Sequence, residues 1–540
     1  MDCTDTNLFR FMKKASPWLI AATVLLLGFL SYRWMNRPVA ASDQQTDTLD
    51  VNLIVEPVIE HLPDTAFLSA KRISFTVDRK DTVNDGRISS LEDHYAATSS
   101  VLTFRRGIRR QGNFDGRLDS LPSRMRIEWR VDTERDEVDT IYGPWGGGTG
   151  WTGQPLYVEW PDSSVGKFKS REVVTADFDG REIIVGSLCG KVYFLNPDNG
   201  NPTRQPIDIG NPIKGTPSID PSLNGNLYVG QGTPAQRPFG AAVVDLFTGE
   251  ITHFFAEDPD AYRRWGAYDS SPLRIGQFLF RPGENGSLYK FTIEQGSLAL
   301  HSVLRYRVNG VAPGIESSMA VYRNYGFITD NHGNIIAVDL DTMCPVWHYA
   351  LGDDTDASPM LTLEEDVPYL YVGCEIDRQG EEGYANFVKL HALTGEEVWK
   401  TPIEGINKLM GTKQRNGGFF ASPLLGVGDC EGLIFTNVVK NTEQLNGSFL
   451  AIDCADGRIV YELPFGHYSW SSPAGFLTAD GQMVVATGDG IGQIRLIAGR
   501  TGEVLATQRI GINFESSPLV LGNALFIGSR ENGIYKITVE

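Results

Sequence analysis

The sequence predicts an all-β protein, namely an eight-bladed β-propeller of four-stranded blades, preceded by one N-terminal transmembrane helix and a linker. Two features of the chain lead to this fold class. Residues 101–540 repeat a pattern of short apolar runs separated by turn residues, and the chain carries 58 glycines in 540 residues. Helical periodicity is absent from this region, so each unit of the repeat is interpreted as a small sheet.

The N-terminal helix is predicted from one apolar stretch. Residues 15–32, ASPWLIAATVLLLGFLSY, contain no charged residue and at ~1.5 Å per residue span a hydrocarbon core of ~30 Å. Three basic residues precede the stretch and two follow it, which favours a cytoplasmic N-terminus over residues 1–14. We therefore expect a signal-anchor helix over residues 15–34, with the propeller on the periplasmic or extracellular side. The alternative is a cleavable signal peptide with VAAS, residues 39–42, as its cleavage region.

Residues 35–100 show no sustained period and are predicted to be a linker. The stretch ASDQQTDTLD is typical of a polar tether, and KRISFTVDRKDTVNDGRISS, residues 71–90, allows one hairpin.

The repeat over residues 101–540 is marked by a start signature: a small polar residue, a proline and then an apolar run. Within each unit a second run ends in glycine, a third run often ends in aspartate, and a turn such as TGE leads into a fourth run. The spacing between signatures, from 40 to 64 residues, is close to the ~40–50 residues of one propeller blade. The signatures lie at Pro155, Pro217, Pro272, Met319 (in the proline position), Pro359, Pro423, Pro473 and Pro518.

The eighth unit has only three strands before the chain ends, so its fourth strand must come from elsewhere. A ring of blades leaves no free edge only if its first and last segments pair. Residues 123–133, SRMRIEWRVDT, alternate in polarity and place Trp129 where Trp347 and Trp399 stand in their own units. We therefore expect this segment to close the propeller.

Charge and cysteine content narrow the possible functions. The formal net charge of −19 makes the chain a poor general binder of nucleic acid. The six cysteines include no CxxC pair, so neither a zinc site nor a thioredoxin-like site is supported. Cys430 and Cys454 flank an apparent hairpin, and the sequence leaves open both a disulfide between them and two free thiols.

The units resemble the pyrroloquinoline-quinone (PQQ) type of β-propeller repeat. The resemblance rests on IIVGSLCGKVYFLNPDNG, on FVKLHALTGEEVW, and on the entry VLTFRRGIRRQGNFDG followed by RIEWRVD, and it covers residues 101–540. It implies the architecture more strongly than the function, because one fold carries unrelated activities.

Two branches of this family are relevant. The quinone-dependent alcohol and sugar dehydrogenases typically use calcium, a catalytic aspartate, a tryptophan floor under the quinone and, in many members, a disulfide between adjacent cysteines. This chain has no adjacent cysteines and lacks their long insertions. Its short loops are closer to envelope scaffolds of the outer-membrane barrel-assembly type, although the anchor predicted here differs from the lipid attachment of that scaffold.

Candidate site residues lie just before the start signatures, at Asp269, Glu316, Asp356 and Glu515. Innermost strands begin at one rim of a propeller channel, so these carboxylates are expected to converge there. Such carboxylates raise one another's pKa or recruit a cation such as calcium. The alternative is that they accept hydrogen bonds from loop amides or pair with nearby basic residues.

The loops that enter the innermost strands are rich in residues typical of binding hot spots. A partner surface at the channel rim is expected from Arg263, Arg264, Trp265 and Trp470; the alternative is that the aromatic residues pack between blades.

The sequence therefore favours a non-enzymatic scaffold that binds a protein partner in the cell envelope and needs no cofactor. A PQQ- and calcium-dependent alcohol or sugar dehydrogenase is the first alternative, and a propeller receptor for a glycan or small ligand is the second.

Overall fold

The computed structural model describes residues 73–540, except residues 82–84, 113, 141, 152, 236, 295–296, 411–412 and 444. The described residues belong to one compact unit, Asn52–Glu540. The predicted N-terminus (1–14), membrane helix (15–34) and first part of the linker lie outside them. Within the described part of the chain, no helix combines the length and apolar character needed to cross a membrane.

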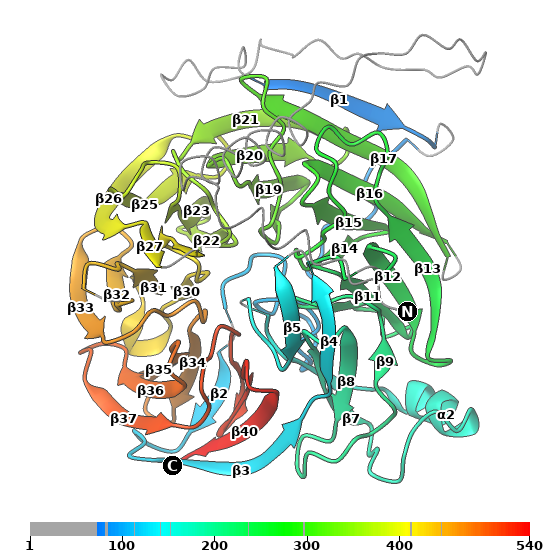
Figure 1. The fold of residues 1–540 in the computed structure, drawn as a ribbon, viewed down its shortest axis with the longest axis horizontal. Coiled ribbons are helices and arrows are strands. Elements are labelled where there is room, and N and C mark those ends of the chain that lie inside the picture. Colours follow the sequence, from blue (N-terminus) through cyan, green and yellow to red (C-terminus); the bar gives the residue numbers. More distant parts are fainter. Residues whose placement is uncertain are drawn as a thin grey trace, which may run out of the picture. The chain divides into compact units, whose positions relative to one another are not determined.

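The described chain is an all-β propeller in which sheets follow one another around a centre (Figure 1). Blade 1 consists of β6 (Leu156–Glu159), β7 (Arg181–Gly186), β8 (Lys191–Leu195) and β9 (Ile207–Asp208). Blade 2 consists of β10 (Ser218–Ile219), β11 (Asn226–Gly230), β12 (Gly240–Asp245) and β13 (Glu250–Ala256). Blade 3 consists of β14 (Leu273–Ile275), β15 (Phe278–Gly283), β16 (Ser287–Glu294) and β17 (Ser297–Val308). Blade 4 consists of β18 (Ala320–Tyr322), β19 (Tyr325–Thr329), β20 (Asn334–Asp339) and β21 (Cys344–Ala350).

Blades 5 to 8 complete the ring. Blade 5 consists of β22 (Met360–Glu364), β23 (Val367–Gly373), β25 (Glu382–His391) and β26 (Glu397–Ile406). Blade 6 consists of β30 (Leu424–Leu425), β31 (Leu433–Val439), β32 (Gly447–Asp453) and β33 (Ile459–Phe465). Blade 7 consists of β34 (Ala474–Thr478), β35 (Met483–Gly488), β36 (Gln493–Ala498) and β37 (Val504–Arg509). Blade 8 consists of β38 (Leu519–Gly522), β39 (Ala524–Gly528), β40 (Gly533–Val539) and β3 (Met125–Asp132).

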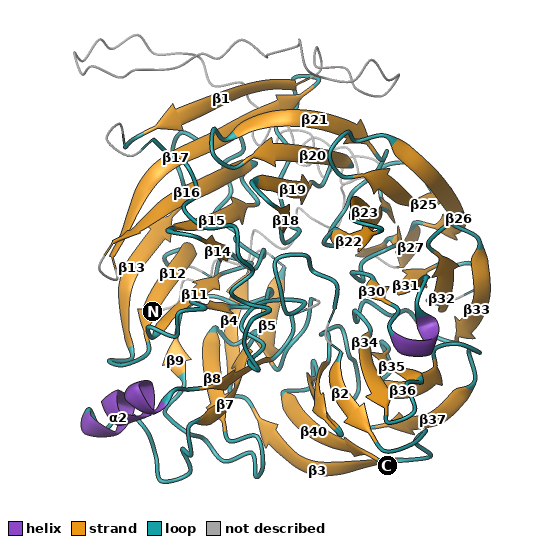
Figure 2. Ribbon diagram, turned by 180° about the vertical axis from the view of Figure 1, so that it is seen from behind, coloured by secondary structure: helices purple, strands orange, loops and turns teal. Residues whose placement is uncertain are grey.

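The closing strand is the one that the sequence predicts. β3 pairs antiparallel with β40, from Met125 opposite Val539 to Asp132 opposite Gly533. Blade 8 therefore takes its outer strand from the N-terminal side of the ring and its three inner strands from the C-terminus (Figure 2).

Part of the expected linker is built into the fold, which corrects the prediction for residues 73–100. β1 (Ile73–Arg79) pairs antiparallel with β17 and adds a fifth strand to blade 3. The alternating polarity of ISFTVDR suits an outer strand, and Tyr95 further along is fully buried. The remaining elements are insertions: the hairpins β4 (Arg135–Thr140)–β5 (Gly143–Gly147) and β27 (Lys408–Met410)–β28 (Lys413–Arg415), the paired strands β24 (Glu375–Ile376) and β29 (Gly417–Gly418), helix α2 (Asp162–Ser170) and the 3-10 turn η3 (Gly428–Cys430).

The start signature marks a ring of hydrogen bonds around the channel. The residue before each signature proline (or before Met319) carries a hydroxyl in seven of the eight units. At six junctions this hydroxyl accepts a hydrogen bond from the backbone N–H of the corresponding residue in the preceding blade. Such bonds, of 2.8–3.2 Å, join Gln154 to Thr216, Ser271 to Ser318, Ser318 to Ser358, Ser358 to Ser422, Ser422 to Ser472 and Ser472 to Ser517. Ser517 instead donates its N–H to the carbonyl of Gly153, which joins blade 8 to blade 1.

Residues 101–118, here called the axial segment, contact the innermost strand region of every blade in order. The contacts begin with a bridge between Val101 and Tyr157 of blade 1 and end at β2 (Asp115–Leu118), which pairs parallel with both β34 and β38. Between them, the segment bonds Ile219, Ser271, Val321, Leu361 and Leu425 of blades 2 to 6. One stretch of chain thus ties all eight inner edges together.

Two arginines of the axial segment bind carbonyl groups of the inner strands. Arg105, 1% exposed, donates to the carbonyls of Pro423 and Pro473. Arg110, fully buried, donates to the carbonyls of Met319 (3.0 Å) and Ser271 (2.8 Å). Burial lowers the pKa of Arg105 to about 9 and that of Arg110 to about 10.

Neighbouring blades are also joined at their outer strands by tryptophans. Trp129, Trp347 and Trp399 each donate the indole N–H to a carbonyl in the next blade, that of Pro197, Ala392 and Cys454 respectively. Each indole lies over a turn glycine with φ near +75°, so Trp129 holds the position that the sequence comparison with Trp347 and Trp399 predicts.

The disulfide that the sequence leaves open is not formed. Cys430 and Cys454 are free and buried. Cys430 packs with residues of blade 7 such as Met483, whereas Cys454 packs with Trp399 of blade 5. The two thiols therefore belong to opposite faces of blade 6.

The tryptophan contact predicts unequal effects of two alanine substitutions. Gly395 and Gly249 have the same φ of +75°. A Cβ at Gly395 would come within 2.7 Å of Trp347, whereas a Cβ at Gly249 would have no atom within 4 Å. Gly249→Ala should cost ~1–2 kcal/mol for the backbone conformation, and Gly395→Ala a further ~1–3 kcal/mol for overpacking. Thermal and urea unfolding of both variants measures the difference in the free energy of unfolding. Equal losses of stability would contradict the close packing of Trp347 on Gly395.

Candidate functional site

The candidate site is a small cavity at the rim where the innermost strands begin. Its volume is about 30 Å³. Phe104 of the axial segment lines it together with residues of blades 1 to 7: Trp151, Gly215, Thr216, Asp269, Glu316, Ser318, Asp356, Ser358, Phe420 and Trp470. Each blade supplies residues from the loop that precedes its inner strand, and therefore the propeller symmetry gathers side chains from distant sequence positions.

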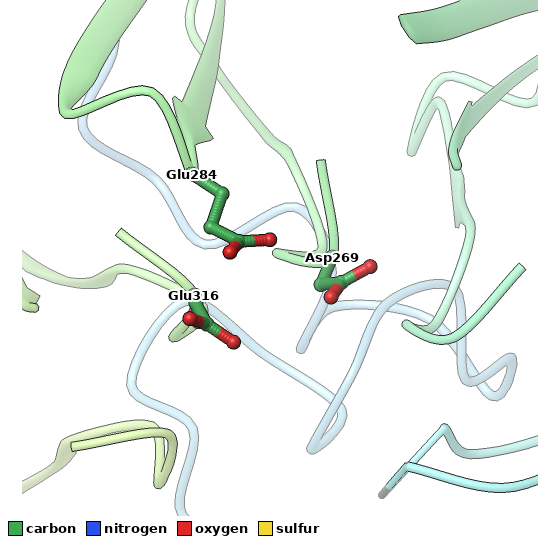
Figure 3. A group of neighbouring side chains, drawn as sticks. All are labelled: Asp269, Glu284 and Glu316. Atoms are coloured by element: carbon green, nitrogen blue, oxygen red, sulfur yellow. The ribbon is translucent and has the colours of Figure 1, made fainter. Parts of the chain in front are cut away.

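One wall of the cavity is acidic. Asp269, Glu284 and Glu316 offer carboxylate oxygens that lie within 4.8 Å of one another, and Figure 3 shows the three carboxylates converging. Asp354, Asp356 and Glu375 form a second group with the same spacing. These six residues are called the acidic cluster below.

Two basic side chains of the described residues form ion pairs with the acidic cluster. Lys214, 7% exposed, pairs with Asp269. Arg263 pairs with Glu284 at 3.3 Å. No ion pair reaches Glu316, Asp354, Asp356 or Glu375 from any residue that the structure describes, so the cluster keeps an excess of carboxylates.

Burial and mutual repulsion raise the pKa values of Asp269, Glu284, Asp354, Asp356 and Glu375. Burial, followed by repulsion from neighbouring carboxylates, raises the pKa of Glu284, Asp354, Asp356 and Glu375 well above the ordinary range. Burial also raises the pKa of Asp269 to about 6 although Lys214 opposes the shift. For Lys214 burial acts to lower the pKa, but attraction to Asp269, Glu284 and Glu316 outweighs it and the pKa is raised.

The acidic cluster also contains oxygens without a hydrogen-bond donor. Glu284 is 6% exposed and Glu375 is 2% exposed, and in each one carboxylate oxygen has no hydrogen-bond partner. A buried polar atom left without a partner is rare in folded proteins and costly. The rim is therefore suited to a ligand that carries positive charge or hydrogen-bond donors.

The cavity lining also contains an aromatic group, Trp151, Phe420 and Trp470. The ring centroids of Trp151 and Trp470 are 5.3 Å apart in an edge-to-face contact, and Trp470 stacks on Phe420 at 4.8 Å. The Lys214 ammonium lies 4.6 Å from the Trp151 ring centroid. Lys214 is thus held between an indole face and the carboxylate of Asp269.

The structure brings together four of the residues that the sequence singles out. Asp269, Glu316, Asp356 and Trp470 line the same cavity, as expected for loops that share one rim. Of the four predicted carboxylates, Asp269 and Glu515 follow the alternative of pairing with a basic residue, Lys214 and Arg530 respectively.

The other predicted residues lie around the cavity rather than in it. Glu515 bonds Tyr468 and Asn513 and pairs with Arg530 at 3.7 Å. Arg263 is engaged by Glu284, Arg264 is exposed, and Trp265 packs edge-to-face on Phe239.

Sequence reasoning missed Lys214, Glu284, Asp354 and Glu375. Two of these had a usable signal, because the second strand of a blade runs antiparallel to the first and ends where the first begins. Residues just after the second-strand glycine must therefore return to the same rim, as do Glu284 one residue after Gly283 and Glu375 two residues after Gly373.

Comparison with known proteins supports the fold. No family model matches the sequence, and no curated protein matches it. Among solved structures, quinohemoprotein alcohol dehydrogenase from Comamonas testosteroni is 12% identical, covers 84% of this chain and 83% of its own, and gives a TM-score of 0.55. Quinohemoprotein alcohol dehydrogenase ADHIIG from Pseudomonas putida HK5 is also 12% identical, with coverages of 82% and 80% and a TM-score of 0.51.

BamB from Moraxella catarrhalis is a further structural neighbour. It is 15% identical, covers 68% of this chain and 95% of its own length, and gives a TM-score of 0.45. The two alcohol dehydrogenases, whose TM-scores exceed 0.5, support the propeller fold of this chain. Identities of 12–15% say nothing about activity.

A PQQ-sized quinone does not fit the cavity. Pockets for ligands of this size occupy ~300–1,000 Å³, whereas this cavity measures about 30 Å³, the space of one or two water molecules. Phe104 closes it from the axial segment, and Trp151 and Trp470 contact each other across its aromatic side. The lining of this cavity provides carboxylate ligands for a cation but not the volume that a quinone needs.

The raised pKa of Glu375 predicts a pH-dependent effect of Glu375→Gln. A carboxyl whose folded pKa exceeds its unfolded value of ~4.3 stabilises the fold below that pH, and this contribution is lost as pH rises through the folded pKa. Glutamine resembles the protonated acid, so the variant should match the parent protein near pH 4 and melt at higher temperature near pH 8. Thermal unfolding across this range, in buffer without divalent cations, measures it.

The control for this experiment is Glu503→Gln, which removes a charge from an exposed turn. A constant difference between Glu375→Gln and the parent protein at all pH values would contradict the prediction.

Proposed function

We propose that the protein is a non-enzymatic scaffold that binds a protein partner through the rim of its channel. The observation that carries the proposal is the cavity itself, which is too small for a quinone yet combines an acidic wall, an aromatic wall and unpartnered buried oxygens. Binding hot spots are enriched in tryptophan, tyrosine and arginine, and these residue types surround the cavity.

Exposed side chains on the insertions and on a loop between blades are candidates for further contacts with a partner. Tyr142, on the hairpin turn between β4 and β5, is 67% exposed, and Leu409 of the β27–β28 hairpin is 66% exposed. Arg264 adds an exposed charge in the loop that carries Trp265 and Asp269. These loops come from different blades, as is typical of a propeller that binds with one face.

The similar fold of the quinohemoprotein neighbours is compatible with the dehydrogenase alternative, but the rim cavity is too small for the quinone cofactor. The glycan alternative would use the same aromatic side chains. No observation in the described residues favours it over a protein partner, and the excess of carboxylates favours a positively charged ligand over a neutral sugar.

We also propose that residues 15–34 anchor the protein in the membrane, with the propeller on the periplasmic or extracellular side. The support is the uncharged apolar stretch and the basic residues before it. A partner would then be an envelope or membrane protein.

Partner capture tests the scaffold function. The full chain, solubilised from membranes, should retain a partner protein that crosslinks to it, and Arg264→Glu should reduce recovery several-fold because it reverses a rim charge. Arg500→Glu, an exposed change on an outer turn of blade 7, is the matched control and should not alter recovery. Oxidation of alcohols or sugars with added PQQ and calcium, coupled to a dye, or equal recovery with both variants, would contradict the proposal.

Thiol labelling tests the topology. Cys344 is the partly exposed cysteine of the propeller, and Cys3 lies on the predicted cytoplasmic side. A membrane-impermeant maleimide applied to cells with a permeable outer layer should label Cys344 but leave Cys3 unlabelled until the membrane is dissolved, with Cys344→Ser as the control. The reverse pattern, or release of the protein by alkaline carbonate, would refute the anchored arrangement.

A further inference from the structure

We propose that the cavity at the channel rim binds an alkylammonium group, supplied by a lysine side chain of the partner protein. This inference rests on the proposed scaffold function and specifies the chemistry that the rim recognises. Three observations support it: the composition of the cavity lining, the charge balance of the acidic cluster and the two contacts of the Lys214 ammonium.

The mixed lining suits an organic cation better than a bare metal ion. The carboxylates of Asp269, Glu316 and Asp356 and the rings of Trp151, Phe420 and Trp470 belong to residues that line the same cavity. Calcium prefers six to eight oxygen ligands distributed around it, and magnesium prefers an octahedron of oxygens. An ammonium group, in contrast, gains from both a carboxylate and an aromatic face.

The charge balance supplies the second step. The six carboxylates of the acidic cluster are met by ion pairs from Lys214 and Arg263 within the described residues. Glu284 and Glu375 each keep a buried oxygen without a donor, and Figure 3 shows Glu284 pointing toward Asp269 and Glu316. An ammonium group brings three N–H donors and one positive charge, which matches this need.

Lys214 shows that the site accommodates this chemistry. Its ammonium pairs with Asp269 and lies 4.6 Å from the Trp151 ring centroid. A second ammonium on the side of Glu316, Asp356 and Trp470 would make the equivalent contacts there. The volume of about 30 Å³ holds a group of the size of an ammonium ion, while the methylene stem of the lysine would lie in the mouth between the aromatic side chains.

Small probes test the proposal on the full chain in detergent. N-acetyl-lysine amide should bind, as measured by calorimetry and by a change in tryptophan fluorescence. N-acetyl-norleucine amide, which has a similar apolar stem without the ammonium group, should not bind. Calcium and magnesium chloride are tested separately, and putrescine serves as a free amine. If calcium binds and N-acetyl-lysine amide does not, the site is a metal site and the proposal is overturned.

Variants then locate the binding. Glu316→Gln and Trp470→Leu should each weaken binding of N-acetyl-lysine amide about tenfold, because each removes one of the two kinds of contact. Trp399→Leu is the matched control, since Trp399 packs between the outer strands of blades 5 and 6 and does not line the cavity. Trp470→Phe should restore most of the affinity. Unchanged affinity in both site variants would overturn the assignment even if the probe binds.

The source of the ammonium group is decided by competition. N-acetyl-lysine amide should displace the captured partner, and norleucine amide should not. If the amine binds at the rim but the partner stays bound, a free amine rather than a lysine is the ligand, and the lysine assignment is overturned. The probe measurements need no partner, so a failure of capture refutes the scaffold function without being confused with a failure of the ammonium site.

Discussion

The rest of the structure depends on the axial segment and its two buried guanidinium groups. The innermost strand of each blade has one edge that no strand of its own sheet covers, and exposed strand edges leave carbonyl groups without donors. Arg105 and Arg110 supply donors to four such carbonyls, in blades 3, 4, 6 and 7. A guanidinium suits this task because it presents five donors in a fixed plane, whereas a lysine would offer three from one point.

Burying two positive charges costs free energy, which the lowered pKa values of Arg105 and Arg110 reflect. The acidic cluster lies at the same rim, with Phe104 of the axial segment lining the cavity beside Asp269 and Glu316. The same segment therefore joins the inner edges of the blades and lines the cavity.

The architecture was largely predictable from the sequence, because repetition makes weak local signals consistent. The start signatures, the closing strand around Trp129 and the convergence of Asp269, Glu316 and Asp356 all follow from the order of apolar runs in one unit. The axial segment was not predictable in the same way. It makes about one contact with each blade, and its sequence shows no periodicity. In the sequence, Arg105 and Arg110 cannot be distinguished from exposed basic residues, because their carbonyl partners lie far along the chain.

The strand β1 and the second half of the acidic cluster were missed for a related reason. β1 pairs with an outer edge whose position depends on the whole ring, so its sequence shows only a short alternating run. Lys214 lies in an ordinary loop sequence, and its role appears only when the loop before blade 3 places Asp269 beside it. Long-range pairs of charges are fixed by the angle between blades, which no local pattern encodes.

The acidic cluster also explains why a binding function is the economical interpretation of this rim. A protein selected for stability alone would gain by replacing Glu375 or Glu284 with a neutral side chain, since desolvation and like charges both disfavour their ionised forms. Six carboxylates gathered around one cavity impose a cost that the fold itself does not need, because the serine ring and the axial segment already join the blades. Such a cost is typical of sites where stability is given up for recognition. The proposal of an organic cation as the ligand follows from the tryptophans that line the same cavity as Asp269, Glu316 and Asp356.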